Sequence, residues 1–173
     1  MTSSFTIRYI VYMSVFLLTF EVFLPDNLMT SFCVFLTQTM YLLISPFTNE
    51  IFINKDILGW TDNTFSIQIL AECSALTYCS ILAAAILSYP APRALRIKAA
   101  ILGFVFLQGI NVLRLISLLY VGHYWPEQFT WVHQNLWPIF LSVDLVLLYL
   151  LWIRHSEKVN TNITKNLESS AVS

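Results

Sequence analysis

The chain has few charged residues for its length, and this scarcity excludes a soluble globular protein. Of its 173 residues, 11% are charged and 57% are hydrophobic, and the mean hydropathy is +0.69. A soluble domain of this size could not bury so much apolar surface. The net charge of -1 and the lack of a basic stripe exclude a nucleic-acid-binding protein. The composition predicts an all-α integral membrane protein.

Cysteine is also scarce, with Cys33, Cys73 and Cys79 as the only three and no C-x-x-C motif. On a helix, the six-residue spacing of Cys73 and Cys79 would turn the two side chains apart and prevent a bridge. An odd number without redox spacing excludes a disulfide framework and disfavours a thiol redox protein. We therefore expect at least one free thiol, and no metal or cofactor.

The hydropathy pattern predicts about five transmembrane helices, each near the ~20 residues that a bilayer requires. The predicted spans are 7–24, 28–47, 70–89, 99–121 and 134–153. The first lacks a small-x-small cleavage site and is interpreted as a retained span rather than a signal peptide. Residues 1–155 would form one polytopic membrane domain, and the polar tail 156–173 is predicted to be disordered and cytoplasmic.

One long polar stretch, residues 48–69, separates the second and third spans. Its last run, 64–69, alternates polar and apolar residues, which is typical of an extended strand. This predicts a short strand-like segment on the outer face that leads directly to Cys73.

Loop charges predict the orientation of the spans. The loop 90–98 and the segment 154–173 together carry six Lys and Arg residues, whereas the loop 122–132 carries none and the stretch 48–69 carries only Lys55. Basic loops stay in the cytoplasm. The side of the N-terminus stays open, because five spans place it outside whereas Arg8 favours the inside; a re-entrant segment among the first two spans would reconcile the two.

This orientation brings Cys73, Arg114 and His133 to the outer leaflet. Arg114 is the only charge in the segment 99–122. A charge at the centre of a span costs about 2.5–3.5 kcal/mol on insertion scales, so such a residue is a functional candidate. Its long side chain can reach from about 10 Å below the outer end of its helix toward the interface.

Cys73 is a candidate nucleophile, since a nearby cation stabilises a thiolate and an imidazole can accept its proton. The alternative is a small apolar residue that only packs in a helix. The polar neighbours Glu72 and Ser74 distinguish Cys73 from Cys33 and Cys79.

Arg114 is a candidate for stabilising an oxyanion or holding a substrate carbonyl or carboxylate. Asn111, one turn away on the same face, could orient the guanidinium. The alternative is a structural ion pair between Arg114 and either Asp144 or Glu21.

His133 is a candidate general base, because an imidazole titrates near neutral pH. The alternative is an interfacial histidine in an aromatic belt formed with Trp125, Trp131 and Trp137. His123 lies in the same outer loop region and is a rival base that spacing does not separate from His133.

Three blocks together resemble the exosortase/archaeosortase family of membrane-embedded cysteine transpeptidases. They are residues 71–76 (AECSAL), residues 111–115 (NVLRL), and His133 at the start of the span after the arginine span. The order Cys, Arg, His on successive spans agrees with that family, and the resemblance covers about residues 60–153.

The resemblance implies that Cys73 is the nucleophile, Arg114 stabilises substrate or transition state, and His133 rather than His123 is the base. It implies a protease/transpeptidase of the bacterial inner membrane with its active site on the outer face. Its substrates would be exported proteins with a C-terminal signal made of a short motif, a transmembrane helix and a basic cluster, and the cleaved end would pass to an envelope acceptor.

The chain departs from this family in two ways. Ala75 stands where the family usually has glycine after Cys-Ser, and the chain has fewer spans than many members, which leaves room for an accessory subunit. A non-enzymatic membrane subunit that anchors or assembles an envelope complex is the alternative function, and in that case Arg114 and Asp144 would form an intramembrane pair.

Overall fold

The chain folds into helices and one small sheet. The structure is a computed structural model that describes residues 2–19, 25–62 and 64–171. The helices are α1 (Thr2–Leu18), α2 (Asp26–Ile44), α3 (Leu76–Ser88), α4 (Arg93–Tyr124), α5 (Pro126–Trp131) and α6 (Trp137–Ala171). A 3-10 turn, η2 (Ala71–Ser74), precedes α3, and a π-helical turn, η3 (Val132–Leu136), precedes α6. The strands are β1 (Ile51–Asn54), β2 (Ile57–Trp60) and β3 (Ser66–Gln68).

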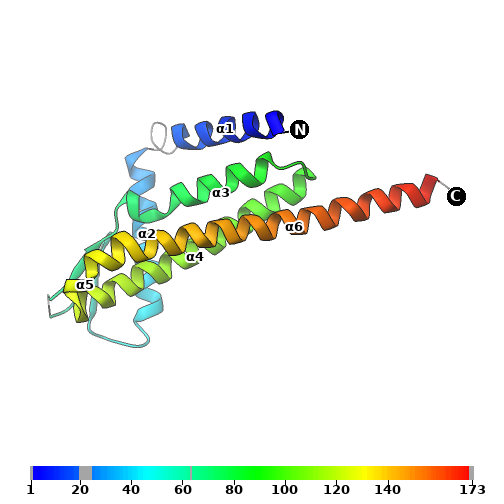
Figure 1. Ribbon diagram of the computed structural model, residues 1–173. Helices are drawn as coiled ribbons and strands as arrows, with labels where there is room; N and C mark the ends of the chain where they lie inside the picture. The colour runs from blue at the N-terminus through cyan, green and yellow to red at the C-terminus, as the bar shows by residue number, and fades with distance from the viewer. Residues whose placement is uncertain (1, 20–24, 63, 172–173) are drawn as a thin grey trace.

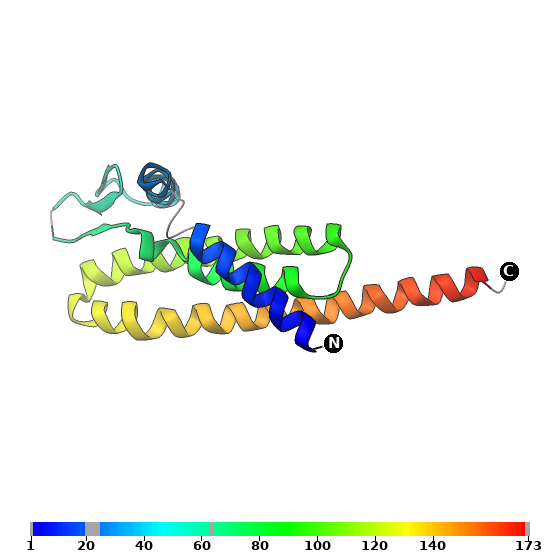
Figure 2. The same cartoon turned by 90° about the horizontal axis from the view of Figure 1, so that it is seen from above.

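The two longest helices, α4 and α6, lie side by side and antiparallel (Figure 1). The short α5 and η3 join them at one end, which is also the end where the sheet lies. Helix α3 packs against both long helices, and α1 packs on α3. Helix α6 continues well beyond the other helices toward the C-terminus, as both views show (Figure 2).

Helix α2 crosses the long helices instead of running beside them. It descends across α3 and α4 in Figure 1 and is seen end-on in Figure 2, where α4 and α6 lie in the plane of the picture. Its inner face packs on α4, η2 and the sheet, while Phe35, Leu42 and Leu43 on its other face are exposed. Helix α2 and the pair α4–α6 therefore cannot all follow one direction through a bilayer.

Two apolar clusters hold these elements together. The first joins α2 and the sheet to the second half of α4, and the second joins α3 and α6 to the first half of α4. The fully buried members of the first include Leu36, Met40, Leu58, Ile69, Leu115 and Leu119. Helix α4 is common to both clusters and so fixes the sheet relative to the helices.

The sheet is antiparallel in the order β1-β2-β3. A two-residue turn at Lys55 and Asp56 joins β1 to β2, and Lys55 has φ 53°, in the left-handed region that such hairpin turns use. Beyond the β2–β3 pairing, the Ile69 amide donates to the Asp56 carbonyl at 2.8 Å, which keeps the chain extended almost to η2. Trp60 Nε1 donates to the Leu119 carbonyl at 3.5 Å and ties the sheet to α4.

The predominantly helical fold that the sequence predicts is confirmed, and β3 confirms the strand predicted within residues 64–69. The hairpin over residues 51–60 is an addition that the all-α prediction lacks. Within the described residues, three helical segments are long and apolar enough to cross a membrane, which are Asp26–Ile44, Arg93–Tyr124 and Pro126–Thr161. Helices α1 and α3 are shorter. Residues 20–24 of the first predicted span lie outside the described residues.

The polar segment from Ser156 onward, predicted to be disordered, is helical through Ala171 as the end of α6. Once a helix is nucleated, each added residue contributes a hydrogen bond without a new nucleation cost. A long apolar helix can therefore extend into a polar segment that would not form a helix alone.

Gly122 near the end of α4 provides a test of the packing between the sheet region and α4. A Cβ at this position would collide with the ring of Phe65, just before β3, whereas a Cβ at Gly109 on the same helix meets nothing within 4 Å. We expect Gly122→Leu to destabilise the protein by about 1–3 kcal/mol through overpacking, relative to Gly109→Leu, which gains the same helix propensity without a clash. Thermal unfolding of both variants in detergent measures this difference, and equal melting temperatures would show that Phe65 does not pack on α4.

Candidate active site

Cys73 lies in the 3-10 turn η2 and not on a long helix. The sequence predicts a span from residue 70, but α3 begins only at Leu76. The Cys73 amide donates to the Leu70 carbonyl at 2.9 Å and closes the turn. The Cys73 side chain is half-buried and its thiol is free. The candidate nucleophile therefore sits on a tight turn between the sheet and α3.

Ala75 explains why the helix starts late. Its backbone has φ 54° and ψ 15°, the left-handed conformation that favours glycine and costs other residues about 1–2 kcal/mol. Its side chain is buried. An alanine therefore occupies a backbone conformation that favours glycine.

Helix α4 holds the η2 turn through a row of polar side chains. Gln108, Asn111 and Arg114 are spaced three residues apart and so lie along one face of the helix. Gln108 Nε2 donates to the Ser74 carbonyl at 2.8 Å, and Asn111 Nδ2 donates to the Cys73 carbonyl at 3.0 Å. Two backbone carbonyls that no helix satisfies are thereby paired, and the Cys73 backbone is fixed to α4.

Arg114 is buried, with 7% of its surface exposed. Its Nη1 donates to Asn111 Oδ1 at 3.4 Å, which is the orientation that the sequence predicts, and its buried Nε has no hydrogen-bond partner. Across the described chain, Arg114 forms no ion pair, with Asp144 or with any other carboxylate. Glu21, the other suggested partner, lies outside the described residues. A buried guanidinium with so few partners retains free donors for another group.

Arg114 is linked to the turns that carry both other candidate residues. Asn111 joins the Arg114 side chain to the Cys73 carbonyl, and Ser117 joins the Arg114 carbonyl to Trp137, next to the turn that carries His133. Cys73 and His133 share no hydrogen bond in the portion of the chain that the structure covers. Apo sites often hold their catalytic groups further apart than the reacting complex does. Arg114 is therefore the element common to the thiol and the imidazole.

His133 lies in η3, half-buried, with its ring stacked on Phe129 at a centroid distance of 5.7 Å. The start of α6 is fixed to α4 close by, because Trp137 Nε1 donates to Ser117 Oγ at 3.0 Å and Ser117 Oγ donates to the Arg114 carbonyl at 2.7 Å. Trp137 thus forms an internal contact, whereas Trp125 and Trp131 are exposed. These contacts hold the η3 turn at the level of Arg114.

His123 belongs to a separate cluster on the sheet. Its ring stacks on Trp60 with centroids 4.2 Å apart, and its Nδ1 lies 2.7 Å from Thr64 Oγ1. Since a carboxylate only accepts hydrogen bonds, the Thr64 hydroxyl donates to Asp62 at 2.7 Å, and the His123 Nδ1–H donates to Thr64. The Thr64 backbone N–H and hydroxyl hold the pKa of Asp62 below its usual range. His123 is thereby engaged in holding the sheet against α4.

The other predicted supporting residues have different positions. Glu72 is exposed and forms no ion pair with Arg114 among the described residues. Ser74 is buried and acts through its carbonyl and through Oγ, which accepts from the Leu76 amide at 3.4 Å. Cys33 and Cys79 are both buried, and Cys33 lies in the apolar cluster against which Cys73 packs. Gln108 was not predicted, although its spacing of three from Asn111 was a usable signal.

The arrangement suits acyl transfer. A partly accessible thiol sits on a fixed turn, a buried cation with free donors lies near it, and an imidazole lies near the same cation. No group of three or more His, Cys, Asp or Glu residues that could hold a metal ion occurs in the described part of the chain. No protein-family model, curated protein or solved structure matches the chain.

Substitutions at Ala75 test the backbone of the turn. Ala75→Gly relieves about 1–2 kcal/mol of left-handed strain. It also removes a buried methyl group and increases the conformational entropy of the unfolded chain, and these two losses together are about as large as the gain. For Ala75→Gly we expect the free energy of unfolding to change by no more than about 1 kcal/mol, which corresponds to about 2–4 °C in melting temperature. Ala75→Val places a β-branched residue at positive φ in a buried site, and we expect it to lower stability by more than about 2 kcal/mol.

The control for Ala75→Val is Ala71→Val, at an exposed position of the same turn. Thermal unfolding in detergent gives the comparison. If Ala75→Val is as stable as Ala71→Val, then residue 75 does not have the left-handed conformation.

Proposed function

We propose that the chain is a membrane-embedded cysteine peptidase or transpeptidase that cleaves C-terminal sorting signals of exported proteins. The observation that carries this proposal is the state of Arg114, a buried cation with no carboxylate partner among the described residues and a link through Asn111 to the Cys73 backbone. Leaving a buried charge unpaired is strongly unfavourable. An anion that forms only during reaction is a partner that would justify it.

The proposed reaction begins at the Cys73 thiol. His133 accepts the thiol proton, the sulfur attacks the carbonyl carbon of the scissile peptide, and Arg114 stabilises the resulting oxyanion. When the intermediate collapses, the C–N bond breaks and His133 returns the proton to the leaving amine. Water or an acceptor nucleophile then attacks the thioester and releases the thiol.

The membrane setting is part of the same proposal. The helices α4 and α6 would cross the bilayer with the sheet, η2 and η3 on the outer face, and the basic loop before α4 in the cytoplasm. Helix α2 crosses these two helices and would lie along the outer leaflet instead of spanning it. This placement reconciles the basic Arg8 with an N-terminus on the cytoplasmic side. The compartment would be the bacterial inner membrane.

The non-enzymatic alternative predicts a pair between Arg114 and Asp144. That pair does not occur in the described chain. The catalytic interpretation is therefore better supported by the surroundings of Arg114, and it retains an accessory subunit and an envelope acceptor as expected partners.

Cys73→Ala tests the nucleophile. We expect it to abolish processing of a tagged exported protein from the same genome that ends in a short motif, an apolar helix and a basic cluster, since the other two thiols, Cys33 and Cys79, are buried. Cys79→Ala, a buried thiol at the start of α3, is the matched control and should retain processing. Immunoblotting of the tagged substrate, at equal enzyme levels, distinguishes the precursor from the product. Normal processing by Cys73→Ala would end the peptidase proposal.

The two histidines provide a second test. His133→Ala should block processing, because it removes the proposed base while Trp137 still fixes the start of α6. His123→Ala should lower the melting temperature, because it removes the stack on Trp60 and the bond to Thr64, yet leave cleavage largely intact. The same immunoblot and thermal unfolding give both results. Loss of cleavage in a stably folded His123→Ala with normal cleavage in His133→Ala would reverse the assignment.

A further inference from the structure

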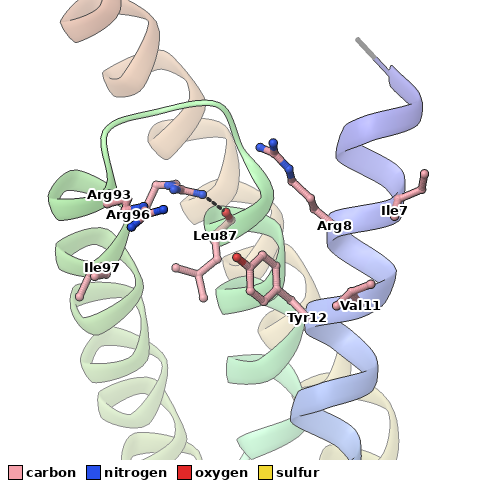
Figure 3. Close-up of a pocket in the computed structure, with 8 residues that line it drawn as sticks. All are labelled: Ile7, Arg8, Val11, Tyr12, Leu87, Arg93, Arg96 and Ile97. Atoms are coloured by element: carbon pink, nitrogen blue, oxygen red, sulfur yellow. Dashed lines mark hydrogen bonds between the residues drawn. The ribbon is translucent and has the colours of Figure 1, made fainter.

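A basic pocket lies at the opposite end of α4 from the candidate active site. It has a volume of about 520 Å³ and lies between α1, the end of α3 and the start of α4 (Figure 3). Three arginines contribute to it, Arg8 from α1 and Arg93 and Arg96 from α4. The remaining lining residues are Ile7, Val11, Tyr12, Leu87 and Ile97.

The pocket contains positive charge without a compensating acid. Its lining has no Asp or Glu, and none of its arginines forms an ion pair within the described ranges of the chain. Arg96 Nη1 donates to the Leu87 carbonyl, and its buried Nε has no hydrogen-bond partner. Figure 3 shows Arg8 pointing from α1 toward the gap that the two α4 arginines border. Three guanidinium groups gathered in this way repel one another unless an anion lies between them.

The start of α4 adds to this positive potential. Helix α4 begins at Arg93 after Pro92, with no side-chain cap and no acidic residue in its first turn. The first N–H groups of a helix lack internal partners, and the helix dipole favours an anion there. Guanidinium groups and free backbone amides together are the donors that phosphate oxygens prefer.

The apolar rim of the pocket indicates where the phosphate comes from. Ile7, Val11 and Ile97 are 59%, 53% and 55% exposed. The apolar part of α4 follows directly from Ala99, so the pocket lies where the charged end of the helix meets its apolar segment. A free phosphate would gain nothing from this rim, whereas an acyl chain would cover it.

We propose that Arg8, Arg93 and Arg96 form a site for the phosphate of an anionic phospholipid, whose acyl chain lies over Ile7, Val11 and Ile97. The site is independent of the proposed peptidase chemistry. It would anchor α1 to the start of α4, and both of these helices also pack on α3. Loop charges place this end of α4 in the cytoplasmic leaflet, where anionic lipids attract basic residues.

The test uses the full chain in detergent, with phosphatidylglycerol and phosphatidylcholine as probes. Native mass spectrometry should show that the wild-type chain retains phosphatidylglycerol in preference to phosphatidylcholine. The variant Arg8→Gln with Arg93→Gln should lose this preference by about tenfold for each arginine removed, because each substitution removes a charge-assisted hydrogen bond to the lipid phosphate. Arg96 is left unchanged because its bond to Leu87 supports the loop.

The control carries Arg154→Gln with Lys158→Gln, two exposed basic residues of α6 outside the pocket. It should retain phosphatidylglycerol as the wild-type chain does. An equal preference in the pocket variant and the wild-type chain would overturn the proposal. If inorganic phosphate raises the melting temperature as much as phosphatidylglycerol does, the site binds a free anion and the lipid assignment is wrong.

Discussion

The hydrogen bond from Asn111 to the Cys73 carbonyl is the constraint on which the candidate site depends. Asn111 is fully buried and uses both ends of its amide, since Nδ2 binds the turn and Oδ1 accepts from Arg114. In apolar surroundings an unmatched amide would be strongly unfavourable. One side chain therefore couples the backbone that carries the thiol to the cation proposed to act on its substrate, and neither can shift far without breaking a buried bond.

The same helix places the rest of the site by packing. Helix α4 takes part in both apolar clusters, and it receives η2 on one part of its surface and the start of α6 on another. Ser117 links the Arg114 carbonyl to Trp137 at the start of α6. The η3 turn, which carries His133 and directly precedes Trp137, is therefore held beside the turn of α4 that carries Arg114. Cys73 and His133 are therefore positioned by their separate links to α4, and not by a direct contact with each other.

The sequence predicts that Asn111 and Arg114 share a helix face, but it does not predict the turn that carries Cys73. Asn111 and Arg114 were paired from their spacing because helical periodicity alone determines which side chains share a face. The η2 turn was not foreseen, since a left-handed conformation at Ala75 is not expected from an alanine. The hairpin was missed because its two strands are four residues each and carry no glycine in their turn. The angle at which α2 crosses α4 depends on how α2 packs against the sheet. The hydropathy of the sequence carries no information about such packing.

The spacing of two arginines along α4 also constrains the depth of the helix in the membrane. Arg96 and Arg114 are eighteen residues apart, which is about 27 Å at the helical rise per residue. The hydrocarbon core of a bilayer is about 30 Å thick. The bilayer with its headgroups is about 40–45 Å thick, so if the arginine pocket lies at the phosphates of one leaflet, Arg114 lies beyond the midplane in the outer half of the hydrocarbon core. From that depth its long side chain can extend toward the outer interface. A lipid phosphate in the pocket would therefore fix the height of the candidate active site in the membrane.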